Sequence, residues 1–236
     1  MFPSDLETIL FDAGGTLVHV DYDHVVAVAA AEGVAVDRER MPLGDAAARL
    51  AVDLRLRDTE VQADSDAARI PHYFADLLIG AGVAADAARA LAPKVQEAHF
   101  ESNLWRVAFD DAAETLAALR RAGLATAVIS NADGRIRSIL DAAGLLPHLD
   151  YVIDSHEEGV EKPDPEIFRR ALARSGTAPD RALYVGDIYA VDVLGARGAG
   201  IEACLLDPTG GYGTVDCPTV VSLTELGRRL VRGVTG

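Results

Sequence analysis

Residues 9–17 read Ile-Leu-Phe-Asp-Ala-Gly-Gly-Thr-Leu, and the interpretation of the whole chain starts from this stretch. An apolar run from Leu6 to Phe11 ends at a carboxylate that is followed by two glycines. Such a run predicts a buried strand, and two adjacent glycines after it predict a sharp turn. Ligands of open α/β sheets bind beyond the carboxyl ends of the strands, so we expect Asp12 at the mouth of a sheet. A simple turn cap is the alternative interpretation of Asp12.

The composition is that of an ordinary globular chain, with 236 residues of which 50% are hydrophobic and 25% are charged. A formal net charge of −15 argues against nucleic acid and anionic membrane surfaces as partners. No apolar run is long enough to span a bilayer, and the N-terminus does not resemble a secretory signal. Two cysteines without metal-ligand spacing predict no disulfide framework. We therefore expect a cytoplasmic protein, and both a monomer and a homodimer stay open.

The pattern of apolar residues divides the chain into a helical block and an alternating part. Residues 18–103 show no convincing strand, and helices are expected there over 21–32, 44–57, 66–79 and 85–103. From residue 104 onward helices alternate with strands, which are expected at 124–130, 151–153, 182–185, 201–206 and 220–221. The helices of this part are expected at 110–122, 134–143, 165–175, 189–199 and 223–231. This alternation predicts an α/β fold with a parallel sheet of right-handed βαβ units. The most loop-like stretch, 210–213, is interpreted as a flexible connection.

Polar side chains follow the ends of the predicted strands, and a lysine precedes the helix expected at Pro165. Because the carboxyl ends of parallel strands gather at one rim, we expect these side chains to lie close together. Carboxylates on one rim repel one another unless a cation lies among them, and oxygen ligands suit a hard ion such as Mg²⁺. A hydroxyl, a lysine and free backbone N–H groups suit a phosphate. The expected rim residues are Asp12, Ser130, Lys162, Asp187 and Asp192.

These residues stand in four motifs that follow one another along the chain. The motifs are Asp12-Ala13-Gly14-Gly15-Thr16-Leu17, Ser130, Lys162 and Gly186-Asp187-Ile188-Tyr189-Ala190-Val191-Asp192. With the helical block they cover essentially the whole chain, and in this the sequence resembles the haloacid dehalogenase-like (HAD) hydrolase superfamily. The resemblance implies a Rossmann-like core, residues 1–17 and 104–236, and an inserted all-helical cap of the C1 type, residues 18–103.

The resemblance also implies an activity, a cofactor and a role for each motif residue. The implied activity is hydrolysis of a small phosphorylated metabolite through an aspartyl-phosphate at Asp12, with Lys162 neutralising the charge of phosphate and nucleophile. The implied ligands of the magnesium cofactor are Asp12, the main-chain oxygen of Gly14 and Asp187, with Asp192 orienting the site. The implied phosphate ligands are Gly15, Ser130, Asn131 and Lys162, and the implied catalytic residues are Asp12, Ser130 and Lys162.

Gly14 is a departure from most phosphatases of this family, which carry a second aspartate two residues after the nucleophile. That aspartate acts as general acid and base, a function worth roughly 10²- to 10⁴-fold in rate. His19 is the best candidate to replace it, because a histidine titrates in the right range. Besides a phosphatase, two alternatives stay open: a 2-haloacid dehalogenase that forms an ester at Asp12, and a nearly inactive protein that binds a phosphoryl ligand for regulation.

Overall fold

A computed structural model of the chain describes residues 2–3, 5–58 and 66–234. The chain divides into two compact units: residues 1–19 with 106–236, here called the sheet unit, and residues 20–105, the helical unit. A two-stranded sheet of β2 (Val18–Val20) and β3 (Trp105–Ala108) carries both junctions. The expectation of no strand in residues 18–103 is therefore wrong at β2, because three residues are too few to show an alternating pattern.

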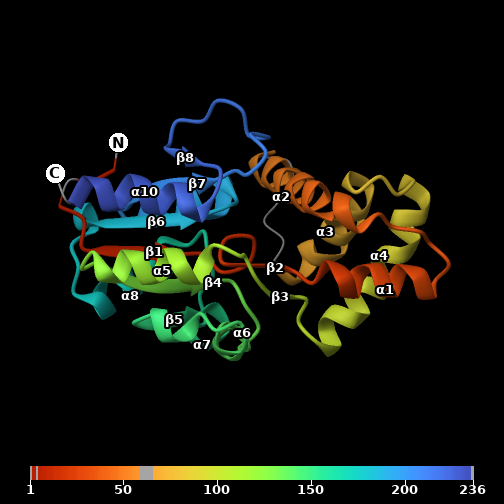
Figure 1. Cartoon of the computed structure of the whole chain (residues 1–236), viewed down its shortest axis with the longest axis horizontal. Coiled ribbons are helices and arrows are strands. Elements are labelled where there is room, and N and C mark those ends of the chain that lie inside the picture. The colour runs from red at the N-terminus through yellow and green to blue at the C-terminus, as the bar shows by residue number, and fades with distance from the viewer. Residues whose placement is uncertain (1, 4, 59–65, 235–236) are drawn as a thin grey trace. The chain divides into compact units, whose positions relative to one another are not determined.

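The sheet unit contains six strands, all parallel, in the order β5-β4-β1-β6-β7-β8 (Figure 1). Counted along the chain within this sheet, the order is that of doubly wound Rossmann-like folds, which confirms the predicted α/β class. The winding reverses between β1 and β6, so a crevice is expected at their carboxyl ends. The strands are β1 Thr8–Phe11, β4 Ala125–Ser130, β5 Tyr151–Asp154, β6 Ala182–Gly186, β7 Glu202–Leu206 and β8 Thr219–Val220.

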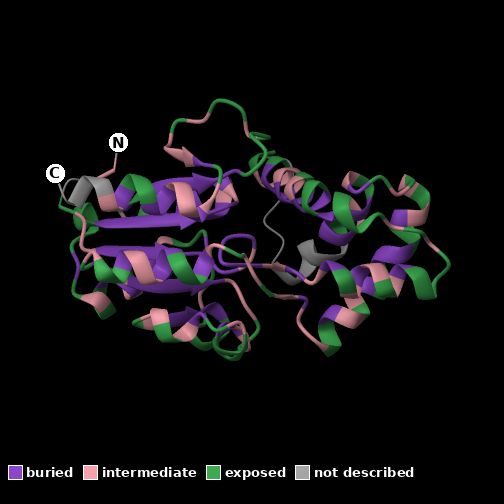
Figure 2. Cartoon of the chain, in the orientation of Figure 1, coloured by how far each residue is buried: buried purple, intermediate pink, exposed green. Residues whose placement is uncertain are grey.

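Helices cover both faces of this sheet, which is why its strands are nearly continuous apolar runs (Figure 2). On one face, side chains of α8 and α9 join Leu10, Tyr184 and Leu205 of the strands in one core cluster. On the opposite face α5 and α10 pack against each other (Figure 1). The helices of this unit are α5 Ala112–Arg121, α6 Ile136–Ala142, α7 Ser155–Glu158, α8 Pro165–Ser175, α9 Leu194–Gly198 and α10 Leu223–Val234.

The helical unit is built from four helices in its described residues: α1 Tyr22–Ala31, α2 Met41–Arg57, α3 Asp66–Gly80 and α4 Ala85–Glu101. Helix α2 begins three residues before the predicted start, because Pro42 suits the first helical turn. Close packing of α2 on α3 needs a glycine, since a Cβ on Gly44 would lie 2.2 Å from the carbonyl oxygen of Leu77. None of the described helices combines the length and the apolar character that crossing a bilayer requires.

A buried polar cluster ties three helices of this unit together. The Asp45 carboxylate on α2 accepts hydrogen bonds from the hydroxyls of Tyr22 on α1 (2.9 Å) and Tyr73 on α3. The same carboxylate pairs with Arg49, one turn further along α2, at 3.5 Å. Burial raises the pKa of both tyrosine hydroxyls, and the charge of Asp45 raises it further. Both tyrosines therefore remain neutral hydrogen-bond donors.

Candidate active site

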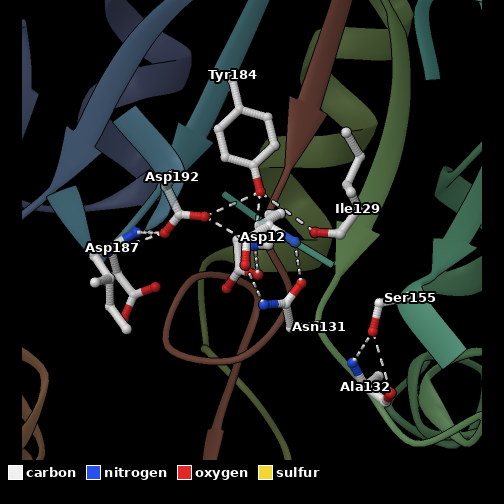
Figure 3. Close-up of polar contacts among 10 residues, drawn as sticks. Asp12, Ile129, Asn131, Ala132, Ser155, Tyr184, Asp187 and Asp192 are labelled. Atoms are coloured by element: carbon white, nitrogen blue, oxygen red, sulfur yellow. Dashed lines mark hydrogen bonds and ion pairs between the residues drawn. The ribbon is translucent and has the colours of Figure 1, made fainter. Parts of the chain in front are cut away.

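The predicted rim residues lie at the carboxyl ends of β1, β4 and β6, and Figure 3 shows three of them, Asp12, Asp187 and Asp192, near one another. Asp12 follows the last residue of β1, Ser130 ends β4, and Asp187 follows the last residue of β6. The backbone N–H of Asp12 donates to the carbonyl oxygen of Val185 at 2.8 Å, which holds the ends of β1 and β6 side by side. These residues therefore lie on a common rim, as the rule on the carboxyl ends of parallel strands predicts.

A tight turn follows Asp12 and leaves one carbonyl open. The backbone N–H of Val18 donates to the Ala13 carbonyl (2.9 Å), and that of Gly15 donates to the Val18 carbonyl (2.7 Å). The positive φ of this turn, +85°, is at Gly15, where a side chain would be strained. Within the described part of the chain, no hydrogen bond reaches the Gly14 carbonyl. This oxygen is therefore available to a ligand.

Lys162 is the central residue of the site. Its ammonium group donates hydrogen bonds to Oδ1 of Asp12 (2.5 Å), Oδ1 of Asp192 (2.8 Å) and the hydroxyl of Tyr184 (2.9 Å). Because a protonated lysine has three N–H donors, all of them are committed. Only 2% of the Lys162 side chain is exposed. Two carboxylates thus share one buried cation, and the cluster carries an excess negative charge.

Burial and charge oppose one another at these groups. Burial raises the pKa of Asp12 to about 6, with Lys162 lowering it and Asp192 raising it. Burial acts to lower the pKa of Lys162, but the Asp12 and Asp192 carboxylates outweigh it and hold this pKa well above its ordinary value. Lys162 therefore stays protonated. A further cation beside Asp12 would lower the pKa of this carboxyl and favour its ionised form.

Asp192 organises the turn that follows β6. Its Oδ2 accepts hydrogen bonds from the backbone N–H groups of Asp187 (3.1 Å) and Ile188 (3.0 Å). The helix predicted here begins instead as a π-helix, Tyr189–Val193, a form that is frequent at functional sites. Gly186 gives the carboxylate its space, since a Cβ there would lie 2.3 Å from Cγ of Asp192. The glycine and the aspartate of this motif therefore depend on each other sterically.

Asn131 and Ser130 follow β4 and differ in what they offer a ligand. Oδ1 of Asn131 accepts a hydrogen bond from the Lys162 backbone N–H (2.7 Å), and its Nδ2 donates to the Lys162 carbonyl (2.9 Å). The Asn131 side chain therefore positions Lys162. The phosphate contact predicted for Asn131 would then be made by the backbone of Asn131. Ser130 is buried, and no group in the described residues hydrogen-bonds to its hydroxyl. This hydroxyl suits a phosphate oxygen.

Tyr184 is a site residue that the sequence did not reveal. An aromatic residue inside an apolar strand is ordinarily part of the core, and only its position two residues before Gly186 places it near the rim. Its hydroxyl also lies 3.2 Å from Oδ1 of Asp192 and 3.3 Å from the carbonyl oxygen of Ile129. His19, the predicted substitute for the missing acid, lies in β2 with its ring 5.0 Å from that of Phe109. Its catalytic role stays a prediction.

The donor chemistry at the rim suits a hard cation. Asp12 and Asp187 supply carboxylates at neighbouring strand ends, and Gly14 supplies the open carbonyl, so every donor is oxygen. In Figure 3 the Asp187 carboxylate extends from its backbone on the side of Asp12. Among the residues that the structure describes, no group of three His, Cys, Asp or Glu side chains forms a metal site. A site made of two carboxylates and one main-chain oxygen contains only two such side chains, so this absence does not exclude it. The residues present fit Mg²⁺.

Comparison with known proteins gives a consistent family. A family model described as haloacid dehalogenase-like hydrolase matches residues 6–200. Haloacid dehalogenase-like hydrolase domain-containing protein 3 of Danio rerio is 40% identical over 130 residues, 53% of each chain. Phosphoserine phosphatase of Thermus thermophilus is 42% identical over 135 residues, 57% of this chain and 53% of that one. The chain thus spans about half the length of the curated relatives it matches.

One solved structure shows the likeness of the fold over nearly the full chain. It is the putative HAD-hydrolase YfnB from Bacillus subtilis bound to magnesium, with a TM-score of 0.65 and 22% identity. The match covers 95% of this chain and 98% of that one.

Proposed function

The chain belongs to the haloacid dehalogenase-like hydrolases, and from this premise we propose that it is a magnesium-dependent phosphatase acting on a small phosphorylated metabolite. The observation that carries the proposal is that two carboxylates, those of Asp12 and Asp192, share the buried ammonium group of Lys162. A cluster with excess negative charge, beside an open carbonyl at Gly14, is suited to a metal ion and an anionic substrate together. The named phosphatase relative supports the same reaction class.

In the proposed mechanism Asp12 is the nucleophile. A carboxylate oxygen of Asp12 attacks phosphorus, the bond from phosphorus to the ester oxygen breaks, and the phosphoryl group is transferred to Asp12. Water then attacks the aspartyl-phosphate, which releases phosphate and restores the carboxylate. Magnesium held by Asp12, Asp187 and the Gly14 carbonyl would supply the charge neutralisation that lets a phosphate approach a carboxylate. The helical unit is proposed as the cap that selects the substrate.

Phosphate binding is assigned to the groups that remain open after β4. The Ser130 hydroxyl and the backbone N–H groups that follow it are proposed to hold the phosphate oxygens. Lys162 acts through its charge, because its three donors already have acceptors. Direct contact with phosphate requires Lys162 to exchange one hydrogen bond. The neutral hydroxyl of Tyr184 is the weakest of the three acceptors, since hydrogen bonds to carboxylates are about twice as strong.

Gly14 is the observation that favours a second candidate, a 2-haloacid dehalogenase. Such an enzyme needs no general acid, because halide leaves without a proton. Asp12 would displace halide from carbon to form an ester, which water then hydrolyses. The hard-cation donor set around Asp12 and Asp187 has no use in that reaction, and for this reason we prefer the phosphatase.

One assay panel distinguishes the phosphatase, the dehalogenase and the regulatory binding protein. It tests aryl phosphates, acyl phosphates, alkyl phosphates and 2-haloacids, each with magnesium and with chelator. We expect phosphate release that requires magnesium. Aryl and acyl phosphates should react fastest, because Gly14 cannot protonate a poor leaving group. Halide release that is equal with and without chelator would identify a dehalogenase instead. Phosphate binding without turnover of any compound would identify the regulatory alternative.

A further inference from the structure

The loop of residues 207–218, between β7 and β8, contains the stretch interpreted from sequence as a flexible connection. The structure instead holds this loop through the buried carboxylate of Asp207, its first residue. Oδ1 of Asp207 accepts a hydrogen bond from the Gly211 backbone N–H (3.1 Å), and Oδ2 accepts one from that of Tyr212 (3.0 Å). One buried carboxylate thus fixes the conformation in which Tyr212 is presented.

A second anchor, Asp216, ties the end of the same loop to the segment that follows Asp187. Arg197 donates to Oδ1 of Asp216 (2.9 Å) and to its carbonyl oxygen (2.8 Å). The Tyr189 hydroxyl donates to the same Oδ1 at 2.6 Å. Tyr189 begins the π-helix and Arg197 lies on α9, so the loop is attached to the elements that carry the last motif.

Between the two anchors, the Tyr212 hydroxyl donates a hydrogen bond to the carbonyl oxygen of Asp187 at 2.9 Å. The backbone N–H of Asp187 is bound by Oδ2 of Asp192 at 3.1 Å. The backbone of this one residue is therefore held at its amide by one side chain and at its carbonyl by another. Tyr212 itself packs against the core cluster on the α8 and α9 face of the sheet, which limits its movement.

We infer that Tyr212 is a positioning residue that fixes the backbone of Asp187 and thereby the direction of the Asp187 carboxylate toward magnesium. The inference rests on the proposed function, in which Asp187 is a metal ligand. Partners that orient a metal ligand are typically worth about 10- to 100-fold in metal affinity. Because Tyr212 acts on the backbone of Asp187 and not on its carboxylate, we expect the low end, about tenfold.

The test is the Mg²⁺ dissociation constant measured by titration calorimetry on the full chain. Tyr212→Phe removes only the hydroxyl, and it should weaken Mg²⁺ binding about tenfold. Tyr151→Phe is the matched control, because the Tyr151 hydroxyl also donates to a main-chain carbonyl, that of Ala171, at 2.7 Å. It lies on β5, at the opposite edge of the sheet from β8. A hydroxyl of purely structural value should lower the melting temperature in both variants and leave Mg²⁺ affinity unchanged.

Asp187→Asn separates the inference from the proposal on which it depends. Mg²⁺ binding that is lost in Asp187→Asn and weakened in Tyr212→Phe, but not in Tyr151→Phe, supports both. Mg²⁺ binding that is lost in Asp187→Asn but equal in the two tyrosine variants overturns the role of Tyr212 alone. A parent protein that does not bind Mg²⁺ overturns both.

Discussion

The two units of the chain each bury a cation among carboxylates and tyrosine hydroxyls, yet the two clusters differ in charge balance and in the backbone around them. The cluster of the sheet unit is Asp12, Lys162, Tyr184 and Asp192. The cluster of the helical unit is Tyr22, Asp45, Arg49 and Tyr73. Among the residues that the structure describes, two carboxylates share Lys162 in the first cluster, and the Asp45 carboxylate pairs with Arg49 in the second. The first cluster therefore has negative charge left for a further cation.

The backbone reinforces this difference. The helical-unit cluster is made by side chains on helices. Tyr22 is the first residue of α1, but Asp45, Arg49 and Tyr73 lie inside α2 and α3, where backbone N–H and C=O groups are already bonded within the helix. The sheet-unit cluster lies where strands end, and there the turn after Asp12 leaves the Gly14 carbonyl open. Buried charge therefore does not by itself identify a site. An uneven charge balance beside open backbone groups is the more informative combination.

Replacing one carboxylate in each cluster should produce the largest difference between the two units. Asp12→Asn keeps the size of the side chain but removes the attacking charge, so turnover should fall by about 10⁴-fold or more. Asp45→Asn removes the buried charge that pairs with Arg49 and accepts from two tyrosine hydroxyls, which should cost about 3 kcal/mol of unfolding free energy. Phosphate release and urea unfolding measure the two effects. The comparison fails if Asp12→Asn keeps most of its turnover, or if Asp45→Asn loses Mg²⁺ binding.

A methyl group added to one glycine in each unit should give a smaller contrast. Gly186→Ala puts a Cβ where Cγ of Asp192 lies 2.3 Å away, so Asp192 has to leave Lys162 and turnover should fall about 100-fold. Gly44→Ala puts a Cβ 2.2 Å from the Leu77 carbonyl oxygen. Overpacking should cost both variants about 1–3 kcal/mol in urea unfolding. A Gly186→Ala protein with normal turnover would show that Asp192 is not needed in this position.

Gly14→Asp adds a third carboxylate to the sheet-unit cluster, after those of Asp12 and Asp192, and should raise activity. It supplies the missing acid and base, and we expect about a tenfold gain on alkyl phosphates, below the 10²- to 10⁴-fold of a natural acid/base. Gly15 and not Gly14 carries the positive φ, so Gly15→Asp is a control that should lose stability without any gain. Steady-state rates on alkyl and aryl phosphates measure the effect. A folded Gly14→Asp enzyme with no gain on any ester would mean that another residue, His19 first, already acts as the acid, or that phosphate esters are not the substrate.

Elements with strong local signals could be predicted from the sequence alone. Helix α8 has the predicted bounds, Pro165–Ser175, because its signals are all local. Asp164 caps it by accepting from the Glu166 N–H (2.9 Å), and Gly176 ends it at φ +70°. The convergence of the rim residues also follows from a general rule on parallel strand ends. That rule fixes where residues gather but not their roles, which stay predictions for Asp12, Ser130 and the metal ligands.

The rest of the fold and of the site depends on contacts between particular residues, and no local pattern records these contacts. The π-helix at Tyr189–Val193 comes with the return of the Asp192 carboxylate to backbone N–H groups four and five residues earlier. Tyr184 acts through a hydroxyl that reaches Lys162 from a neighbouring segment, 22 residues away in sequence. Tyr212 reaches Asp187 across 25 residues. Such roles require three-dimensional neighbours, and a tyrosine in an apolar strand or a glycine-rich loop gives no sign of them.

The smallest contrast concerns the tyrosine hydroxyls of the two clusters. Tyr184→Phe and Tyr22→Phe each remove one buried hydroxyl from a charged partner, and each should cost about 1–3 kcal/mol of unfolding free energy. Their effects on ligand binding should differ. In Tyr184→Phe, Lys162 keeps both carboxylates, and the N–H that bonded to Tyr184 becomes free to donate a hydrogen bond to a phosphate oxygen. Inorganic phosphate should therefore inhibit this variant more strongly, by about fivefold, as expected for one net hydrogen bond of about 1 kcal/mol. In Tyr22→Phe the inhibition constant should not change. Competitive inhibition by phosphate with an aryl substrate measures both, and weaker inhibition of Tyr184→Phe would show that Lys162 does not exchange this hydrogen bond for phosphate.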